Sequence, residues 1–302
     1  MTRLASVVIC TRGRPSLLKR CLVSLAGQRG LCEVLVVENG VPDPVTRSIA
    51  EKADARHLVE PRLGSGPARN RGLRAAQCDL VAYIDDDCEA EAGWLEALLR
   101  PFDAEDVHAV AGQVLPMEVD TPAQRLFDRY LPYSKGIVRR SFGPGPERYP
   151  FPLNANEMGT GANMAFRRNT LCELGGFVAP LSAGGPARGG EDIQAFYAVL
   201  RAEHRLVYEP EARVRHRHPA TVAELDRVFF DYGVAHFAYL THCLLEGRDA
   251  RVVRRMAAIL VHYGQRLAAP SGSDLPRRYL LRHLAGGCLG PVYYLLARRV
   301  YR

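Results

Sequence analysis

The sequence of 302 residues lacks a Cys-x-x-Cys pair, and no basic-then-apolar leader with a cleavage site opens it. Its eight cysteines are scattered, and Cys10, Cys21 and Cys32 lie inside apolar patterns. This placement favours buried reduced thiols over disulfides or a zinc site. Because no export signal is recognised, we expect a cytoplasmic location.

The chain also lacks the full Gly-x-Gly-x-x-Gly signature of dinucleotide-binding folds, since its first predicted strand is followed by TRGRPS. This counts against a nicotinamide-dependent enzyme. A second glycine loop, RLGSGPARN (62–70), allows the backbone to approach a phosphate at Gly64 and Gly66 but does not complete the signature.

Net charge is nearly absent from most of the chain. Residues 1–223 carry a net charge of +1, whereas residues 224–302 contain twelve arginines and six acidic residues and carry +6. The basic residues are therefore concentrated in the C-terminal segment and bear on what that segment binds. We expect no nucleic-acid binding by the protein as a whole. The length fits one large domain or a domain with an appendage.

Short β-branched runs alternate with helical patterns in the first hundred residues. The predicted strands are residues 6–11, 33–40, 57–60 and 80–87. This alternation predicts an α/β fold with a parallel sheet and right-handed crossovers. Ligands bind beyond the carboxyl ends of such strands, so we expect Thr11, Glu38, Asn39 and the aspartates at 85–87 to converge there.

The later part of the chain is less regular. Seven prolines interrupt residues 116–155, which predicts an irregular insertion over the site or a loop that becomes ordered on binding. A strand-like piece and a helix follow within 159–177, and a glycine loop within 180–201 leads into a helix that starts near residue 191. Residues 205–219 read as two short strands separated by a turn, and the chain from 224 onward reads as helical.

Three adjacent carboxylates, Asp85, Asp86 and Asp87, end the buried fourth strand. Carboxylates at positions i and i+2 can hold Mg²⁺ or Mn²⁺, which leave their other coordination positions to phosphates and water. The cation would also remove the repulsion between the three charges. The alternative is a solvated acidic turn.

A candidate base, Glu191-Asp192, opens a helix behind the glycine-rich segment GGPARGG. Acidic residues at a helix N-terminus also serve as caps, and that interpretation stays open on these residues alone. His216 and His218 follow a strand at spacing i and i+2, which can place one of them on a metal or phosphate.

Several motifs in order, from SVVICTRGRPSLLKRCLVSL through EVLVVENG, GPARNRGLRAA, LVAYIDDD, GTGANMAFRR and GGEDIQ to HRHP, resemble the family 2 glycosyltransferases. These are inverting enzymes of the GT-A fold, and the resemblance covers about residues 5 to 218. It implies a Rossmann-like, mostly parallel sheet with flanking helices, followed here by a C-terminal helical appendage. It divides the chain into a catalytic domain (1–223), with a nucleotide-sugar half (about 1–115) and an acceptor half (116–223), and a basic helical region (224–302).

The resemblance also implies roles for individual residues. Asp192 matches the general base, with Glu191 as a positioning or capping neighbour. Asp87, Asp85 and His216 match positions at the metal or diphosphate. The donor-binding residues implied are Thr11, Arg12, Glu38, Asn39, Arg69, Asp85 and Asp86. Family members usually have Asp at the position of Glu38, so nucleoside recognition is expected to differ in detail.

The predicted function is transfer of a sugar from a nucleotide-diphosphate sugar, most often a UDP-sugar, to an acceptor hydroxyl, with Mn²⁺ or Mg²⁺. The acceptor would be a polysaccharide, a glycolipid intermediate or a small natural product. Two alternatives stay open on the sequence: a non-catalytic sugar- or lipid-binding relative, and a nucleotidyltransferase.

The C-terminal segment 277–302 contains a stretch of fourteen residues without acidic or basic side chains, Leu284 to Ala297, with basic residues on both sides. It is too short for a span, which needs about 20 residues. Basic flanks and tyrosines suit a helix at a membrane surface, at the inner face of a cytoplasmic membrane. Packing on the catalytic domain or on a second subunit is the alternative, and the oligomeric state is left open, a dimer included.

Overall fold

The computed structural model of the chain describes residues 4–144, 152–268 and 275–301. The chain divides into two compact units, each assembled from separate stretches. The first unit comprises Met1–Met117, Tyr133–Val178 and Asp192–Arg217; the second comprises Glu118–Pro132, Ala179–Glu191 and His218–Arg302. All strands of the described residues belong to the first unit, and the second unit is helical.

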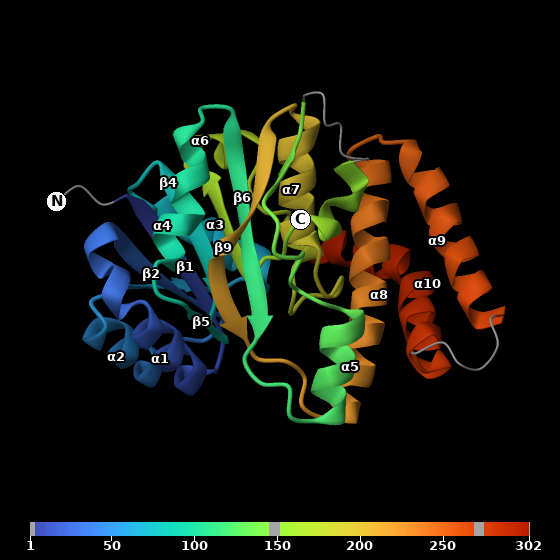
Figure 1. Cartoon of the computed structure of the whole chain (residues 1–302), viewed down its shortest axis with the longest axis horizontal. Coiled ribbons are helices and arrows are strands. Elements are labelled where there is room, and N and C mark those ends of the chain that lie inside the picture. The colour runs from blue at the N-terminus through green and yellow to red at the C-terminus, as the bar shows by residue number, and fades with distance from the viewer. Residues whose placement is uncertain (1–3, 145–151, 269–274, 302) are drawn as a thin grey trace. The chain divides into compact units, whose positions relative to one another are not determined.

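A nine-stranded sheet forms the centre of the first unit, in the order β3-β2-β1-β4-β8-β6-β9-β5, with β7 also paired to β9 (Figure 1). The strands are β1 (Ala5–Thr11), β2 (Cys32–Asn39), β3 (Arg56–Glu60), β4 (Leu80–Asp85), β5 (Cys88–Ala90), β6 (Val107–Pro116), β7 (Arg140–Phe142), β8 (Asn163–Arg167) and β9 (Arg205–His216). Strands β3, β2, β1 and β4 are parallel, β8 runs antiparallel to β4 and β6, and β9 is parallel to β6. The predicted α/β class is confirmed.

Helices cover both faces of this sheet. Successive side chains of β1 point to opposite faces, and the apolar ones on each face are buried by helices. The helices are α1 (Pro15–Ser24), α2 (Pro44–Lys52), α3 (Ser65–Ala75), α4 (Trp94–Leu99), α6 (Arg168–Glu173) and α7 (Glu191–Arg201), with 3₁₀ turns η1 (Ala26–Leu31), η2 (Arg100–Asp103) and η3 (Pro152–Glu157). Val7 and Ile9 join a core that includes Trp94 of α4. On the other face, a Cβ added to Gly72 of α3 would lie 2.4 Å from Val8 Cγ1, so only glycine allows this approach.

The predicted strands agree with the structure to within about two residues at each end. The difference at the end of the fourth strand matters for the site. Strand β4 ends at Asp85, so Asp86 and Asp87 occupy the short turn into β5. Residues 205–216 form one strand, β9, instead of the two that we predicted. The interruption that we expected there appears as a register shift opposite Gly112 and Gln113 of β6.

The prediction of an irregular insertion at residues 116–155 is wrong in part, because this segment contains the helix α5 (Pro122–Tyr130). Thr121 and Gln124 form a reciprocal capping box at the start of α5, and Pro122 occupies its first turn. Proline is favourable at that position, since no intrahelical partner for its missing N–H is needed. The prolines at 146 and 150 lie outside the described residues.

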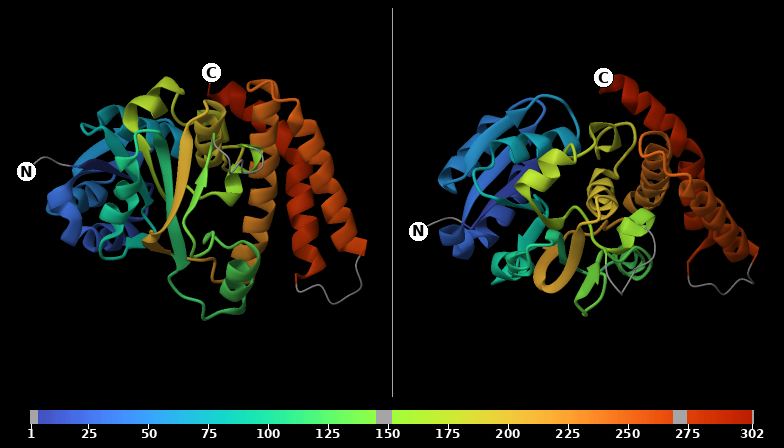
Figure 2. Two further views of the ribbon diagram at one scale, coloured as in Figure 1. Left: turned by 45° about the horizontal axis from the view of Figure 1, so that its top comes forward. Right: turned by 90° about the horizontal axis from the view of Figure 1, so that it is seen from above.

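The second unit is built on three long helices, α8 (Val222–Leu245), α9 (Arg251–Ala268) and α10 (Arg277–Val300), with the short turn η4 (Ala179–Leu181). Both views of Figure 2 show these helices side by side, in orange and red. No helix of the described segments combines the length and the hydropathy that crossing a bilayer requires.

Glycines in α8 and α10 bring these two helices into backbone contact. A Cβ added to Gly286 would lie 2.1 Å from Phe230 O, and one added to Gly233 would lie 2.0 Å from His283 O. In a helix interior glycine costs about 1 kcal/mol relative to alanine. The structure keeps α10 continuous, since the close packing that glycine permits offsets this cost.

Three histidines of the second unit lie among these helices, and we call them the histidine cluster: His283, which is buried, and His236 and His242, which are half-buried. Burial lowers the pKa of His236 to about 3 and the pKa values of His242 and His283 to about 4. His242 Nδ1 lies 2.9 Å from Tyr294 Oη, and His283 Nδ1 lies 3.1 Å from Tyr263 Oη. The cluster is therefore neutral near pH 7 and part of the helical core.

Candidate active site

The middle carboxylate of the aspartate triplet, Asp86, is buried at the end of β4. Thr11 at the end of β1 donates its hydroxyl to Asp86 Oδ2 at 2.6 Å, and Arg14 Nε donates to the same oxygen at 3.1 Å. Burial raises the pKa of Asp86 to about 7, although the charge of Arg14 opposes this shift. Thr11, which we expected to contact the nucleotide, is bonded to the triplet itself.

Asp87 lies between the side chains of Arg14 and His216. Its Oδ2 accepts from Arg14 Nη1 at 2.9 Å, and its Oδ1 lies 3.5 Å from His216 Nε2. The antiparallel pairing of β5 with β9 brings His216 opposite Cys88, next to Asp87. The Tyr133 ring packs edge-on against His216, with centroids 4.8 Å apart.

Arg14 was missed by the sequence analysis, although it belongs to the TRGRPS segment. Burial alone would lower the pKa of Arg14, but the charges of Asp86, Asp87 and Asp85 outweigh burial and raise it. The triplet thus has counterions within the protein, so its repulsion is compensated in part without a bound ion. The sequence feature that could have identified Arg14 was the basic loop at the carboxyl end of the first strand.

A divalent cation fits one edge of this triplet. The potential ligand atoms of Asp87, Cys88 and His216 lie within 4.8 Å of one another. Burial raises the pKa of the Cys88 thiol well above its usual range, so this soft, protonated group suits Mg²⁺ or Mn²⁺ poorly. Asp87 Oδ1 is buried and has no hydrogen-bond partner among the described residues, which leaves a carboxylate oxygen and an imidazole for the cation.

Asp85, the third predicted ligand, pairs instead with a buried arginine. Arg69 Nη2 of α3 donates to Asp85 Oδ1 at 3.0 Å and to Gly161 O at 3.2 Å. Burial raises the pKa of Asp85 and the charge of Arg69 lowers it. The structure therefore brings Asp87 and His216 together, and it holds Asp85 through Arg69.

The candidate base Asp192 joins the same set of contacts through one residue. Gly161, just before β8, donates its N–H to Asp192 Oδ2 at 2.6 Å, while its carbonyl accepts from Arg69. We call the series Asp85, Arg69, Gly161 and Asp192 the base relay. Glu191 is buried, and it is the first residue of α7, where we predicted that this helix begins.

Lys135 is a second residue that the sequence analysis missed. Burial lowers the pKa of Lys135 to about 8, and the charges of Glu157 and Asp192 oppose this shift. Its N–H donates to Tyr208 Oη at 3.1 Å, and its carbonyl accepts from Arg140 Nη2 at 2.5 Å. These bonds fix a lysine of the proline-rich segment near the candidate base. Lys135 reaches this position through its bond to Tyr208 of β9, a residue distant in the sequence.

The predicted nucleoside contacts Glu38 and Asn39 are both engaged with the scaffold. The buried Glu38 carboxylate accepts the Asp43 N–H at 2.9 Å and lies 2.8 Å from His57 Nε2. Asn39 Nδ2 donates to Arg62 O at 2.7 Å, and its Oδ1 accepts the N–H of Gly64 at 2.7 Å. These contacts shape the loops that follow β2 and β3. Arg12, another predicted contact, is exposed.

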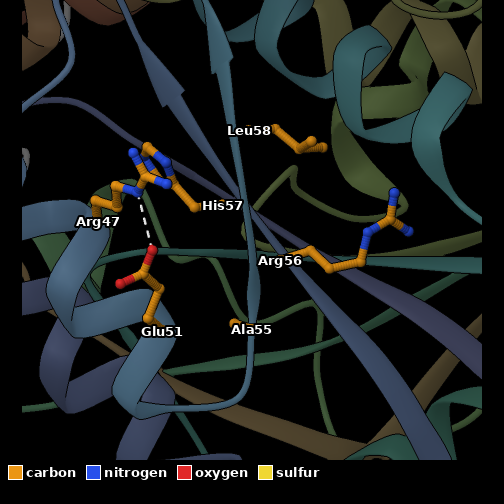
Figure 3. Close-up of a pocket in the computed structure, with 6 residues that line it drawn as sticks. All are labelled: Arg47, Glu51, Ala55, Arg56, His57 and Leu58. Atoms are coloured by element: carbon orange, nitrogen blue, oxygen red, sulfur yellow. Dashed lines mark hydrogen bonds and ion pairs between the residues drawn. The ribbon is translucent and has the colours of Figure 1, made fainter.

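A pocket of about 510 Å³ lies beside β3 and α2 (Figure 3). It is lined by Arg47, Glu51, Ala55, Arg56, His57 and Leu58. An ion pair of 2.9 Å joins Arg47 to Glu51. The predicted site residues do not line this pocket, and its link to them is the contact between His57 and Glu38.

Comparison with known proteins gives the chain a family. The sequence pattern of glycosyl transferase family 2 matches residues 6–175. A pre-mycofactocin glycosyltransferase of Mycobacterium tuberculosis is 31% identical over 218 residues, which are 70% of this chain and 42% of that protein. A glucosyl-dolichyl phosphate glucuronosyltransferase of Haloferax volcanii is 27% identical over 168 residues, 53% of this chain and 50% of that protein. The chain thus matches about half the length of these two relatives.

The fold is also that of solved enzymes. The structure of glucosyl-3-phosphoglycerate synthase from Mycobacterium tuberculosis in complex with Mn²⁺, UDP and glucosyl-3-phosphoglycerate has a TM-score of 0.54 with this chain. The match covers 80% of this chain and 79% of the synthase at 19% sequence identity. Identity this low establishes the shared GT-A fold and nothing about the substrate.

Proposed function

Because the chain belongs to glycosyl transferase family 2, we propose that it transfers a sugar from a nucleotide-diphosphate sugar to an acceptor hydroxyl with inversion. The observation that carries this proposal is the base relay, in which hydrogen bonds connect Asp85 at the strand-end triplet to Asp192 at the start of α7. An inverting transfer needs a group for the diphosphate and a base on the opposite side of the sugar, and the relay joins one candidate for each.

The donor is proposed to be a UDP-sugar bound with Mn²⁺ or Mg²⁺, in line with the UDP and Mn²⁺ in the synthase of the same fold. Asp87 and His216 would hold the cation, with Asp85 beside them. When bound, the cation supplies charge stabilisation for the departing diphosphate. The remaining donor contacts are proposed to come from Thr11, Arg12, Glu38, Asn39, Arg69 and Asp86.

In this proposal Asp192 accepts the proton of the acceptor hydroxyl, and Glu191 supports the start of α7. The hydrogen bond from Gly161 N–H leaves the second carboxylate oxygen of Asp192 to receive that proton. Arg14 would keep Asp86 and Asp87 in place before the donor arrives, because it bonds to both carboxylates. Lys135 adds a positive charge near Asp192, which suits an acceptor with an anionic group.

The acceptor class is proposed more broadly as a polysaccharide, a glycolipid intermediate or a small natural product. The same proposal divides the chain into a nucleotide-sugar half (about 1–115), an acceptor half (116–223) and a basic helical region (224–302). A cytoplasmic location with peripheral membrane contact through residues 277–302 belongs to the same proposal, and a dimer is compatible with it.

The test is a panel of nucleotide sugars incubated with the full chain and Mn²⁺, with release of nucleoside diphosphate as the readout. We expect release from at least one donor, loss of activity in Asp87→Ala, and normal activity in Asp103→Ala, which removes an exposed aspartate elsewhere. Release of inorganic pyrophosphate from nucleoside triphosphates would point to a nucleotidyltransferase. Tight donor binding without turnover would point to a non-catalytic relative.

A further inference from the structure

Helix α10 has two apolar faces, and the second unit covers only one of them. The covered face packs on α8 through Tyr279, Gly286, Gly290 and Tyr294. The other face carries large apolar side chains that are 41–68% exposed. They are Leu281, Leu289, Val292, Leu295, Leu296 and Val300.

These exposed side chains form a stripe along one side of the helix. At 3.6 residues per turn, the positions from Leu281 to Val300 fall within an arc of roughly 140°, and the stripe extends about 28 Å along the helix. Helix α9 adds a second exposed group of apolar side chains, which are 51–59% exposed: Val253, Leu260 and Val261. We call the two groups together the apolar face of α9 and α10.

The apolar face cannot turn inward to bury itself on α8. The opposite side of α10 is fixed by backbone contact, since a Cβ at Gly290 would lie 2.7 Å from Val234 O and 2.7 Å from Phe237 Cβ. Rotating α10 would replace this close contact with leucine side chains, for which there is no room. The exposure of the stripe is therefore built into the packing of α8 and α10.

The charge around the apolar face is strongly of one sign. Residues 250–302 contain ten arginines and one acidic residue, a net charge of +9. Arg282 and Arg299 are exposed and lie next to Leu281 and Val300, at the two ends of the stripe. Arginine side chains can extend from an apolar surface to phosphates while their stems remain in contact with it.

We propose that the apolar face of α9 and α10 binds the surface of an anionic bilayer, with the stripe at the level of the headgroups and the arginines on lipid phosphates. A stripe along the whole helix fits an orientation parallel to the membrane plane. A second copy of this chain fits less well, because a two-fold contact would bring two identical basic segments against each other. This inference rests on the peripheral contact in the proposed function and extends it to α9 and to anionic lipid.

Vesicle co-sedimentation of the full chain tests the proposal, with phosphatidylcholine vesicles that either contain or lack phosphatidylglycerol. We expect binding at low salt that is at least about tenfold tighter with phosphatidylglycerol and that weakens at high salt, because several arginines contribute. The double variant Leu289→Glu/Leu296→Glu should bind roughly 10- to 100-fold more weakly, since it places two charges in the apolar contact.

The matched control is Val23→Glu/Val45→Glu, which places two glutamates at exposed apolar positions of α1 and α2, outside the proposed surface. It should bind vesicles like the unmodified chain. Unchanged binding in the α10 variant, or an unmodified chain that binds neither vesicle, overturns the proposal. A chain that is dimeric in solution, becomes monomeric in the α10 variant and ignores vesicles assigns the face to a second copy.

Release of nucleoside diphosphate, measured on the same samples, separates this inference from the proposed reaction. The α10 variant should keep that activity and its thermal melting temperature, because the substituted side chains are exposed and lie outside the base relay. Loss of vesicle binding with intact activity supports the membrane contact. Intact activity in a chain that never binds vesicles overturns the contact and leaves the reaction standing.

Discussion

Replacing Gly161 by alanine should lower turnover by displacing the members of the base relay. A Cβ at this position would lie 2.8 Å from Arg69 Nη2, 2.8 Å from Asp192 Oδ2 and 2.9 Å from Asp192 Cβ. Ordinary contact begins at 3.4 Å, so Arg69 Nη2 and Asp192 Oδ2 must move by about 0.6 Å and Asp192 Cβ by about 0.5 Å. Arg69 Nη2 and Asp192 Oδ2 are the ends of flexible side chains, whereas Asp192 Cβ is bonded to the backbone at the start of α7, so that backbone must move as well. Arg69 and Asp192 are the side chains that the base relay positions.

The magnitude follows from this geometry. Because the backbone at Asp192 must move together with the side chains, we expect a loss of unfolding free energy of about 1–3 kcal/mol, the usual range for overpacked sites. A displacement approaching 1 Å at a catalytic group can lower turnover by about 100-fold. We therefore expect turnover to fall by roughly 10- to 100-fold in a protein that still folds, with a lower melting temperature.

The assay is the initial rate of nucleoside diphosphate release with Mn²⁺, together with thermal unfolding of the same preparation. Gly27→Ala is the matched control, because a Cβ there meets no atom within 4 Å. A threefold change in rate corresponds to roughly 0.6 kcal/mol in activation free energy. If the Gly161→Ala protein folds and its rate stays within threefold of the unmodified enzyme, the idea that Gly161 positions Asp192 is refuted.

Three further predictions test individual residues. Asp192→Asn should lower turnover by roughly 10²- to 10⁴-fold with donor binding intact, and greater damage from Glu191→Gln in the same kinetic assay would reverse their roles. Turnover of the unmodified enzyme should fall above pH about 8, where Lys135 loses its proton, and Lys135→Arg should lack this fall in the pH–rate profile because arginine stays charged. The histidine cluster has folded-state pKa values below the unfolded value of about 6.5, so the unfolded chain binds more protons and stability should fall as the pH drops from about 6.5 towards 4. This loss amounts to about 2 kcal/mol per histidine near pH 5, and His242→Gln should reduce the slope in denaturant titrations.

The parts of the fold that the sequence predicted well depend on local patterns. The run from Leu80 to Ile84 followed by three aspartates predicts a buried strand with carboxylates at its end, and β4 has this form. The start of α7 at Glu191 also follows from a local pattern, a glycine loop followed by acidic residues. Helix α5 was missed because proline was taken as an interruption, whereas at Pro122 it begins a helix.

The contacts of the site depend on packing between distant segments, which no local pattern reports. Arg14 meets Asp86 and Asp87 only because β1 and β4 are neighbours in the sheet. The link from Arg69 through Gly161 to Asp192 joins a helix, a strand end and a second helix across 123 positions of the chain. Sequence motifs identified most of these residues as candidates, but the order in which they contact one another appears only in the structure.

Proton NMR of the reaction mixture tests the central claim most directly, because it follows the anomeric proton of the sugar from donor to product. With the full chain, Mn²⁺, a competent nucleotide sugar and an acceptor, we predict a new anomeric signal of configuration opposite to that of the donor, together with free nucleoside diphosphate. The signal should not appear with Asp192→Asn in the same time. A product that retains the donor's configuration, or cleavage that leaves the sugar on its phosphate, would contradict the account.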